Sequence, residues 1–212
     1  YQFIRIDQSV ALGLTIRVSF KKENEDRKIE IQNCDKIDMI DKSLNEAINS
    51  ENPDYVMQKI RDEYLKDSSV TISLIGSYSS EKYNQFIKPK EQYYIKKELQ
   101  ASLYHSKGSG RNGILGVVLP EMYNAVFKGS QTCNVCGGAH NIVKVDDDTV
   151  IKEFSVNYYI KEGHTSCAWS EDERYCVLVK WDDFMDDPNK YIDQAWEKRT
   201  EPIVDKITVY PK

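Results

Sequence analysis

Two apolar segments decide the fold of this chain: VTISLIGS at residues 70–77 and GILGVVLP at residues 113–120. Neither segment alternates between apolar and polar residues, and such continuous runs are typical of strands buried on both faces of a parallel sheet. Between them, residues 91–104 predict a helix with Ile95, Leu99 and Leu103 on its apolar face. The order strand, helix, strand predicts an α/β fold with a mainly parallel sheet.

Other parts of the chain supply further elements of this type. Strand patterns occur at 3–6, 14–20, 37–41, 175–181 and 207–210. One helix is predicted to begin after Asn52, which can act as its N-cap, and another is predicted to begin at Pro188. Ile192, Ala195 and Trp196 are expected on the inner face of the second helix. The predicted sheet is therefore flanked by several amphipathic helices.

The composition indicates one folded domain. Of the 212 residues, 40% are hydrophobic and 11% are aromatic, which is enough to build a core. We expect a single domain over 1–212 with an irregular inserted cap over about 121–174, where no long helix or parallel-type strand is evident. A net charge of −5 without a basic stripe argues against a nucleic-acid partner. With no signal-peptide pattern and no apolar stretch of ~18 residues, a cytoplasmic protein without membrane spans is expected.

The region around the first apolar segment resembles a known family. Residues 59–76, KIRDEYLKDSSVTISLIG, closely resemble the bacterial TIR-like proteins of the Thoeris antiphage system, its ThsB subunit. Residues 41–43 fit the end of the family's second strand, and 94–99 are similar to its aromatic-x-x-x-Glu-aliphatic helix. The resemblance covers about 37–120. It implies a flavodoxin-like, doubly wound fold.

The same resemblance implies an activity on NAD⁺. Members of the family that are enzymes cleave NAD⁺ at the nicotinamide–ribose bond, and the ADP-ribose-derived product is a signal that activates an effector. Glu98 would be the catalytic residue, and NAD⁺ would lie as substrate against Gly76, Ser77, Asp41 and Ser43. Protein partners or self-association are also expected.

The residues by themselves support a role for Glu98. On a helical wheel it lies about 100° from the centre of the apolar stripe, at the edge of the buried face. A carboxylate in that position can point into a pocket at the carboxyl ends of the strands. Breaking the nicotinamide–ribose bond produces an oxocarbenium-like sugar, which one carboxylate can stabilise or trap. The alternative is a solvated glutamate beside Lys96 and Lys97.

A different class of function remains open, a non-catalytic TIR-like module that docks other proteins. The family's aromatic-rich first strand and its polar loop are not found in residues 1–33, which favours this alternative. Ser77 and the sequence Asp41-Lys42-Ser43 would then be ordinary turn residues.

The chain has five cysteines, and three of them form a second pattern. Cys133 and Cys136 have the spacing of a zinc knuckle, and His164 and Cys167 form a second pair at the same spacing. His140 is a competing ligand. A zinc-stabilised cap that binds a partner is one interpretation. The other is a set of free thiols that pack as small apolar residues. The sequence does not decide between a zinc site and free thiols, so none of these residues is assigned as a metal ligand.

Overall fold

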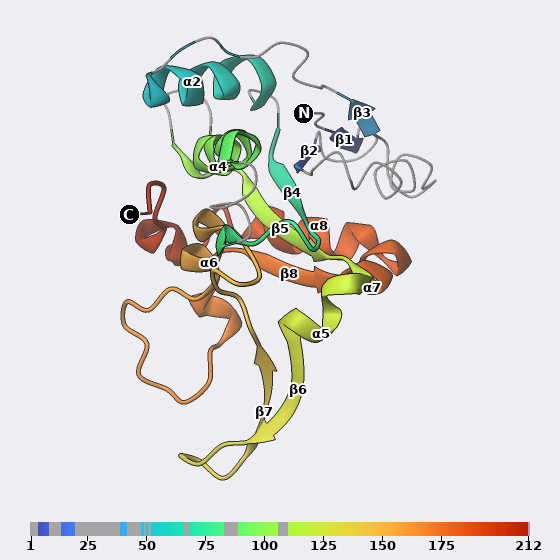
Figure 1. Ribbon diagram of the computed structural model, residues 1–212, viewed down its shortest axis with the longest axis vertical. Coiled ribbons are helices and arrows are strands. Elements are labelled where there is room, and N and C mark those ends of the chain that lie inside the picture. The colour runs from blue at the N-terminus through green and yellow to red at the C-terminus, as the bar shows by residue number, and fades with distance from the viewer. Residues whose placement is uncertain are drawn as a thin grey trace.

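The structure, a computed structural model, describes residues 4–8, 14–19, 39–41, 48, 50, 52–65, 68–82, 89–105 and 110–211. Figure 1 shows a central sheet with helices on both faces and a long hairpin that projects away from it. In these ranges no helix combines the length and the apolar character that a bilayer crossing requires.

Within the described ranges, the central sheet has six strands in the order β3-β1-β2-β4-β5-β8. Their bounds are Ile4–Gln8 (β1), Leu14–Ser19 (β2), Met39–Asp41 (β3), Val70–Ile75 (β4), Gly113–Val118 (β5) and Val177–Lys180 (β8). The strands β2, β4, β5 and β8 pair in parallel, whereas β1 is antiparallel to both β2 and β3. The predicted α/β fold with a mainly parallel sheet is confirmed.

Three helices lie in the predicted amphipathic segments: Pro53–Ile60 (α2), Pro89–Leu103 (α4) and Pro188–Glu197 (α8). The structure adds three helices that the sequence did not predict: Tyr123–Val126 (α5), Lys152–Tyr158 (α6) and Trp181–Asp186 (α7). The chain leaves α2 through a π-helical turn over Arg61–Leu65. Asn52 caps α2 as predicted, because its Oδ1 accepts a hydrogen bond of 3.3 Å from the backbone N–H of Tyr55. Three-residue or five-residue 3-10 turns lie at 120–122, 171–173 and 202–206.

One face of the sheet is covered by α7 and α8. Every residue of β4 and β5 is buried, so both strands have neighbours on both faces. Val70, Ile72 and Leu74 lie on this face and share a cluster with Ile192 and Ala195 of α8. The burial explains why these two strands read as continuous apolar runs, since neither face meets water.

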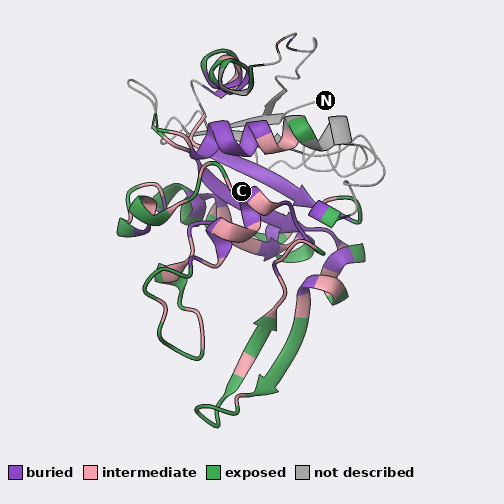
Figure 2. Ribbon diagram, turned by 60° about the vertical axis from the view of Figure 1, so that its left-hand side comes forward, coloured by how far each residue is buried: buried purple, intermediate pink, exposed green. Residues whose placement is uncertain are grey.

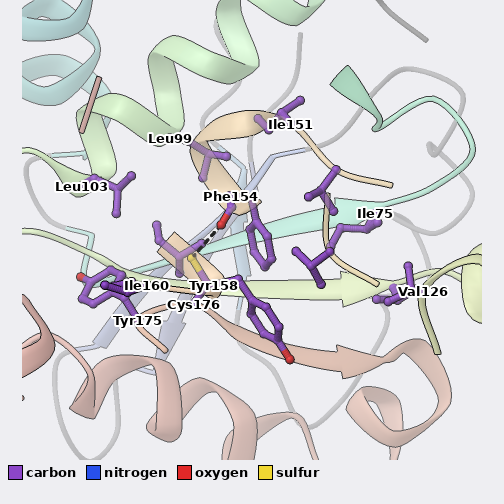
Figure 3. Close-up of a cluster of buried hydrophobic side chains, with 14 of the residues drawn as sticks. Ile75, Leu99, Leu103, Val126, Ile151, Phe154, Tyr158, Ile160, Tyr175 and Cys176 are labelled. Atoms are coloured by element: carbon purple, nitrogen blue, oxygen red, sulfur yellow. Dashed lines mark hydrogen bonds between the residues drawn. The ribbon is translucent and has the colours of Figure 1, made fainter. Parts of the chain in front are cut away.

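The opposite face is covered by α4 and α6. Leu99 and Leu103 of α4 and Phe154 of α6 pack there against the sheet, beside Ile75 (Figure 3). Helix α2 lies outside α4 and forms a further layer, with Ile60 in a cluster that includes Ala101 of α4 (Figure 1). Helix α4 is therefore enclosed between the sheet, α6 and α2.

Two glycines of β5 permit this close packing. A Cβ built on Gly113 would lie 1.8 Å from the carbonyl oxygen of Ala195, so α8 approaches the strand backbone directly. A Cβ built on Gly116 would lie 2.5 Å from the ring of Phe154. A larger side chain at either position would push a helix off the sheet.

The segment 121–174, expected to be an irregular cap, contains regular structure of two kinds. Strands Phe127–Thr132 (β6) and Ala139–Val143 (β7) form a separate antiparallel hairpin. Figure 2 shows that this hairpin is mostly exposed and extends from the body of the molecule. Helix α6 instead packs Phe154 and Tyr158 into the core of the sheet. The segment thus joins a projecting hairpin to a helix that belongs to the main core.

Two sequence predictions near the C-terminus are wrong. Residues 207–210 form no strand, because the backbone of Thr208 pairs with a side chain: its N–H donates to Asn157 Oδ1 (2.7 Å) and its oxygen accepts from Asn157 Nδ2 (2.9 Å). Trp196 is not an inner-face residue of α8. It is 37% exposed, and the guanidinium of Arg199 lies 5.5 Å from its ring centroid.

Candidate functional site

Glu98 is buried, at 1% relative exposure, in the middle of α4. The helical wheel placed it at the edge of the buried face. The structure buries it completely in a helix that is covered on several sides: Leu99 and Leu103 face the sheet, and Ala101 packs against α2. Burying an ionised carboxylate costs several kcal/mol of folding free energy unless its surroundings compensate the charge. Buried carboxylates of this kind are common in functional sites.

Hydrogen bonds at the end of α4 fix where Glu98 lies along the sheet. Ser102, one helical turn after Glu98, has its Oγ 2.8 Å from Oγ1 of Thr71 in β4, and its carbonyl accepts a 2.7 Å bond from the N–H of Asn112. The helix therefore ends beside the beginning of β5 and runs antiparallel to the strands. Four helical residues span ~6 Å, which brings Glu98 to the level of Ser73, toward the carboxyl end of β4.

Gly76 and Ser77 lie at the carboxyl end of β4, as the sequence predicts. Gly76 is buried and Ser77 is exposed. The turn there is held by Ser79, whose Oγ accepts from the N–H of Gly76 (2.9 Å) and donates to the oxygen of Leu74 (3.2 Å). The alternative prediction for Ser77 is an ordinary turn residue, but the side-chain hydrogen bonds of this turn are made by Ser79. Gly76 and Ser77 therefore lie at the carboxyl end of β4, whereas the level of Glu98 along the sheet is three strand residues, ~10 Å, before Gly76.

Asp41 lies further away along the sheet. It is the last residue of β3, and the order of the strands puts β1 and β2 between β3 and β4. At ~4.8 Å per strand, the backbone of β3 is ~14 Å from that of β4. Ser43 lies outside the described residues. The proposed roles of Asp41 and Ser43 stay predictions.

Buried polar contacts hold α4 to α6. Gln100 accepts a 2.9 Å hydrogen bond from Lys97 Nζ and donates another of 2.9 Å to Oε1 of Glu153. Oε2 of Glu153 is buried without a hydrogen-bond partner. Desolvation by burial raises the pKa of Glu153 above its ordinary value. Gln100 is 200° around α4 from Glu98, so this second carboxylate lies on the other side of the helix.

Arg61 is a structural residue that the sequence pattern does not reveal. It is 2% exposed, and its guanidinium donates to the backbone oxygens of Ala101 and Gly110, which ties the end of α2 to the end of α4. Desolvation by burial lowers its pKa. Since Arg61 lies within the amphipathic pattern of residues 53–65 as an ordinary charged position, only the packing of α2 on α4 reveals its role.

Two cavities lie away from these residues. One, of about 880 Å³, is lined by residues of the hairpin, of α6 and of the 167–174 segment, including His140, Tyr159, Trp169 and Arg174. The other, of about 650 Å³, is lined by residues of 145–148 and 155–162, by Lys82 and by 206 and 208. Neither cavity is lined by Glu98, Gly76 or Ser77.

Cysteine and histidine side chains meet beside the larger cavity. The ligand atoms of Cys133, Cys136, His140 and Cys167 all lie within 4.8 Å of one another. Hydrogen bonds from the backbone N–H groups of Cys136 and Val135 lower the pKa of the Cys133 thiol to about 6. Of the two histidines that the sequence left open, His140 joins this group.

His164 is held elsewhere. Its Nδ1 is 2.9 Å from Oε1 of Glu173, and its ring stacks on Trp169 with the centroids 3.7 Å apart. The sequence pattern could not separate the two histidines, because His164 has the better spacing to Cys167 while His140 is brought there by the pairing of β7 with β6.

Comparison with known families gives one match. A family model described as Thoeris protein ThsB, TIR-like domain, matches residues 18–123, which is half of the chain. The matched region runs from β2 to the beginning of α5 and contains Glu98, Gly76 and Ser77. The hairpin, α6, β8 and α8 follow it. No solved structure matches the chain.

Proposed function

Because the chain belongs to the TIR-like domain family of Thoeris protein ThsB, we propose that it serves antiphage defence by cleaving NAD⁺ at the nicotinamide–ribose bond. The ADP-ribose part is released as a signalling molecule that activates an effector. The proposed reaction takes place in the cytoplasm, where NAD⁺ is available, and the effector is reached through the small molecule. Protein partners or further copies of the chain complete the proposed system.

The observation that carries this proposal is the position of Glu98. It is a buried carboxylate on α4, at the level of Ser73 and toward the carboxyl end of β4. Departure of nicotinamide leaves positive charge on C1′ of the ribose, and a carboxylate in a water-poor site stabilises that charge strongly. Glu98 would hold the ribose cation by its charge, or trap it as an ester before the final acceptor attacks.

The order of the strands supports the same location for NAD⁺. The order β3-β1-β2-β4-β5-β8 differs from the flavodoxin-like order 2-1-3-4-5 by one antiparallel strand, β1, which lies between β3 and β2. Ligands of such sheets bind outside the carboxyl ends of the strands. In our proposal, the backbone after Gly76 and the hydroxyl of Ser77 approach the ribose or a phosphate.

A second candidate function is a non-catalytic docking module of the same fold. It is favoured by the N-terminal sequence, since the family's aromatic-rich first strand and its polar loop are not found in residues 1–33. In this alternative Glu98 is a buried structural carboxylate, and the family's role in defence is carried by contacts with other proteins.

Product analysis separates the two candidates. The full chain is incubated with NAD⁺ and an extract of phage-infected cells as the source of activator, and the products are identified by mass spectrometry. If the chain is an enzyme, the wild type should give nicotinamide and an ADP-ribose derivative in equal amounts, and Glu98→Gln should give about 100-fold less of both. Glu153→Gln is the matched control. Glu153 belongs to α6 and contacts α4 on the side away from Glu98, so this variant also removes a buried carboxylate. If the wild type protects cells from phage without consuming NAD⁺, the docking module is the correct function.

A further inference from the structure

Three side chains at the tip of the hairpin, and a fourth from a distant loop, share a spacing that suits a metal ion. Cys136 Sγ lies 3.1 Å from His140 Nε2, and Cys167 Sγ lies 3.6 Å from the same nitrogen. All four ligand atoms, including that of Cys133, lie within 4.8 Å of one another. In tetrahedral sites with Zn–S of ~2.3 Å and Zn–N of ~2.0 Å, neighbouring ligand atoms are ~3.5–3.8 Å apart. The four donors therefore already surround a volume the size of a zinc ion.

The backbone of the hairpin tip places the first two sulfur atoms. Cys133 N–H donates to the oxygen of Gly138 (2.8 Å), and Gly137 N–H donates to the oxygen of Cys133 (2.9 Å), which closes a tight turn. Gly137 has a φ of +72°, a conformation that side chains with a Cβ rarely adopt. The N–H groups of Val135 and Gly138 each point at a cysteine sulfur, at 3.4 Å. Such donors favour the thiolate form that a metal requires.

The hairpin has little apolar packing of its own. Most residues of β6 and β7 are exposed, and Val135 at the tip is 84% exposed (Figure 2). Isolated two-stranded hairpins are marginally stable in water. Cys167 comes from the loop between α6 and the 171–173 turn, and the cluster joins that loop to the hairpin. Figure 1 shows the loop after α6 and the hairpin after α5 extending from the same side of the molecule. A metal would supply stability that apolar burial does not.

We propose that Cys133, Cys136, His140 and Cys167 bind one Zn²⁺ in a closed structural site. Three thiolates and one imidazole are a donor set typical of structural zinc, and four protein ligands leave no open position for a substrate. His164 is not a ligand, because it pairs with Glu173 and stacks on Trp169.

The site also fixes the walls of the larger cavity. His140 of the hairpin and Cys167 of the loop both line that cavity, on the two segments that the metal joins. The proposed zinc therefore sets the distance between these walls. This role is independent of NAD⁺ cleavage, which the proposal places at the end of β4.

The test measures metal in the purified full chain. We expect about one zinc per chain. When the metal has been removed with a chelator, titration with Co²⁺ should give the intense absorption of a tetrahedral cobalt–thiolate site. Cys167→Ser should lower the zinc affinity by about 100-fold or more in competition with a chromogenic chelator. His164→Gln is the matched control. His164 is three residues before Cys167, the spacing that separates Cys133 from Cys136, but it lies outside the cluster, so this variant should bind zinc as the wild type does.

Several results would overturn the proposal. The first is wild-type protein that contains much less than one zinc per chain and binds no zinc after its thiols are reduced. The second is a cobalt spectrum typical of octahedral coordination. The third is an intact mass that shows a disulfide among the three cysteines. Loss of zinc from His164→Gln with retention by Cys167→Ser would transfer the site to the other histidine. If Cys167→Ser fails to fold, the wild-type cobalt spectrum and zinc content decide the question, because neither depends on a variant.

Discussion

At the scale of single residues, Glu98 is the carboxylate whose charge the proposed reaction uses. Glu98→Gln keeps the size of the side chain and removes its negative charge. If that charge stabilises the ribose cation, NAD⁺ turnover by the activated protein should fall by about 100-fold or more. The melting temperature should change little or rise, because a buried amide is less costly to desolvate than a carboxylate. Steady-state kinetics with differential scanning fluorimetry would check both, and equal turnover by wild type and variant would remove Glu98 from the chemistry.

Glu153 should make the stability of the protein depend on pH. Desolvation raises its pKa, with a smaller opposing effect of Lys96 and of the hydrogen bond from Gln100. Between the ordinary pKa and this raised one, the folded state holds a proton that the unfolded state has lost. The free energy of unfolding therefore falls as the pH rises through that window. Glu153→Gln should flatten this slope and stabilise the protein at neutral pH by about 1 kcal/mol.

Urea unfolding of both proteins across the mildly acidic range would measure this difference. Glu121→Gln serves as the control, because Glu121 is an exposed carboxylate that should leave the slope as it is in the wild type. Parallel pH profiles for wild type and Glu153→Gln would show that Glu153 titrates normally in the fold.

At the scale of secondary-structure elements, the contact between β5 and α6 depends on a missing side chain. Gly116→Ala would place a methyl group 2.5 Å from the ring of Phe154, which is 1% exposed and has little room to move. We expect a loss of about 1–3 kcal/mol in the free energy of unfolding. Gly110→Ala is the control, since a Cβ built on Gly110 would meet Arg199 Nη2 at 3.6 Å, an ordinary van der Waals distance. Adding Phe154→Leu to Gly116→Ala should recover part of the loss, and strict additivity in that double-mutant cycle would contradict the direct contact.

At the scale of the whole molecule, stability should be distributed unevenly. The strands β4 and β5 are buried along their entire length, whereas the β6–β7 hairpin is mostly exposed. In chelated protein, amides of β4 and β5 should exchange with solvent only by global unfolding, and hairpin amides should exchange at least about 100-fold faster. Hydrogen exchange followed by mass spectrometry would measure this ratio. Equal protection of hairpin and sheet would mean that the hairpin folds as part of the main core.

The sequence by itself determined the elements whose signal is local. Continuous apolar runs predicted β4 and β5, and the period of Ile95, Leu99 and Leu103 predicted α4, because burial of a strand or of one helix face is written in neighbouring residues. The run through residues 59–76 identified the family. These patterns need no knowledge of which element packs on which.

The tertiary structure alone decided what depends on partners far apart in the sequence. Glu98 is fully buried in a helix that contacts α2 and α6 as well as the sheet, and a helical wheel contains no information about those additional layers. His140 rather than His164 meets the cysteines because the pairing of β7 with β6 places it beside Cys133 and Cys136, and the fold brings the loop with Cys167 to the same point. Thr208 leaves the predicted strand because Asn157 offers its backbone both a donor and an acceptor. In each case the contact joins segments that are far apart in the sequence. The local pattern of either segment does not specify its partner, and only the packing of the folded chain does.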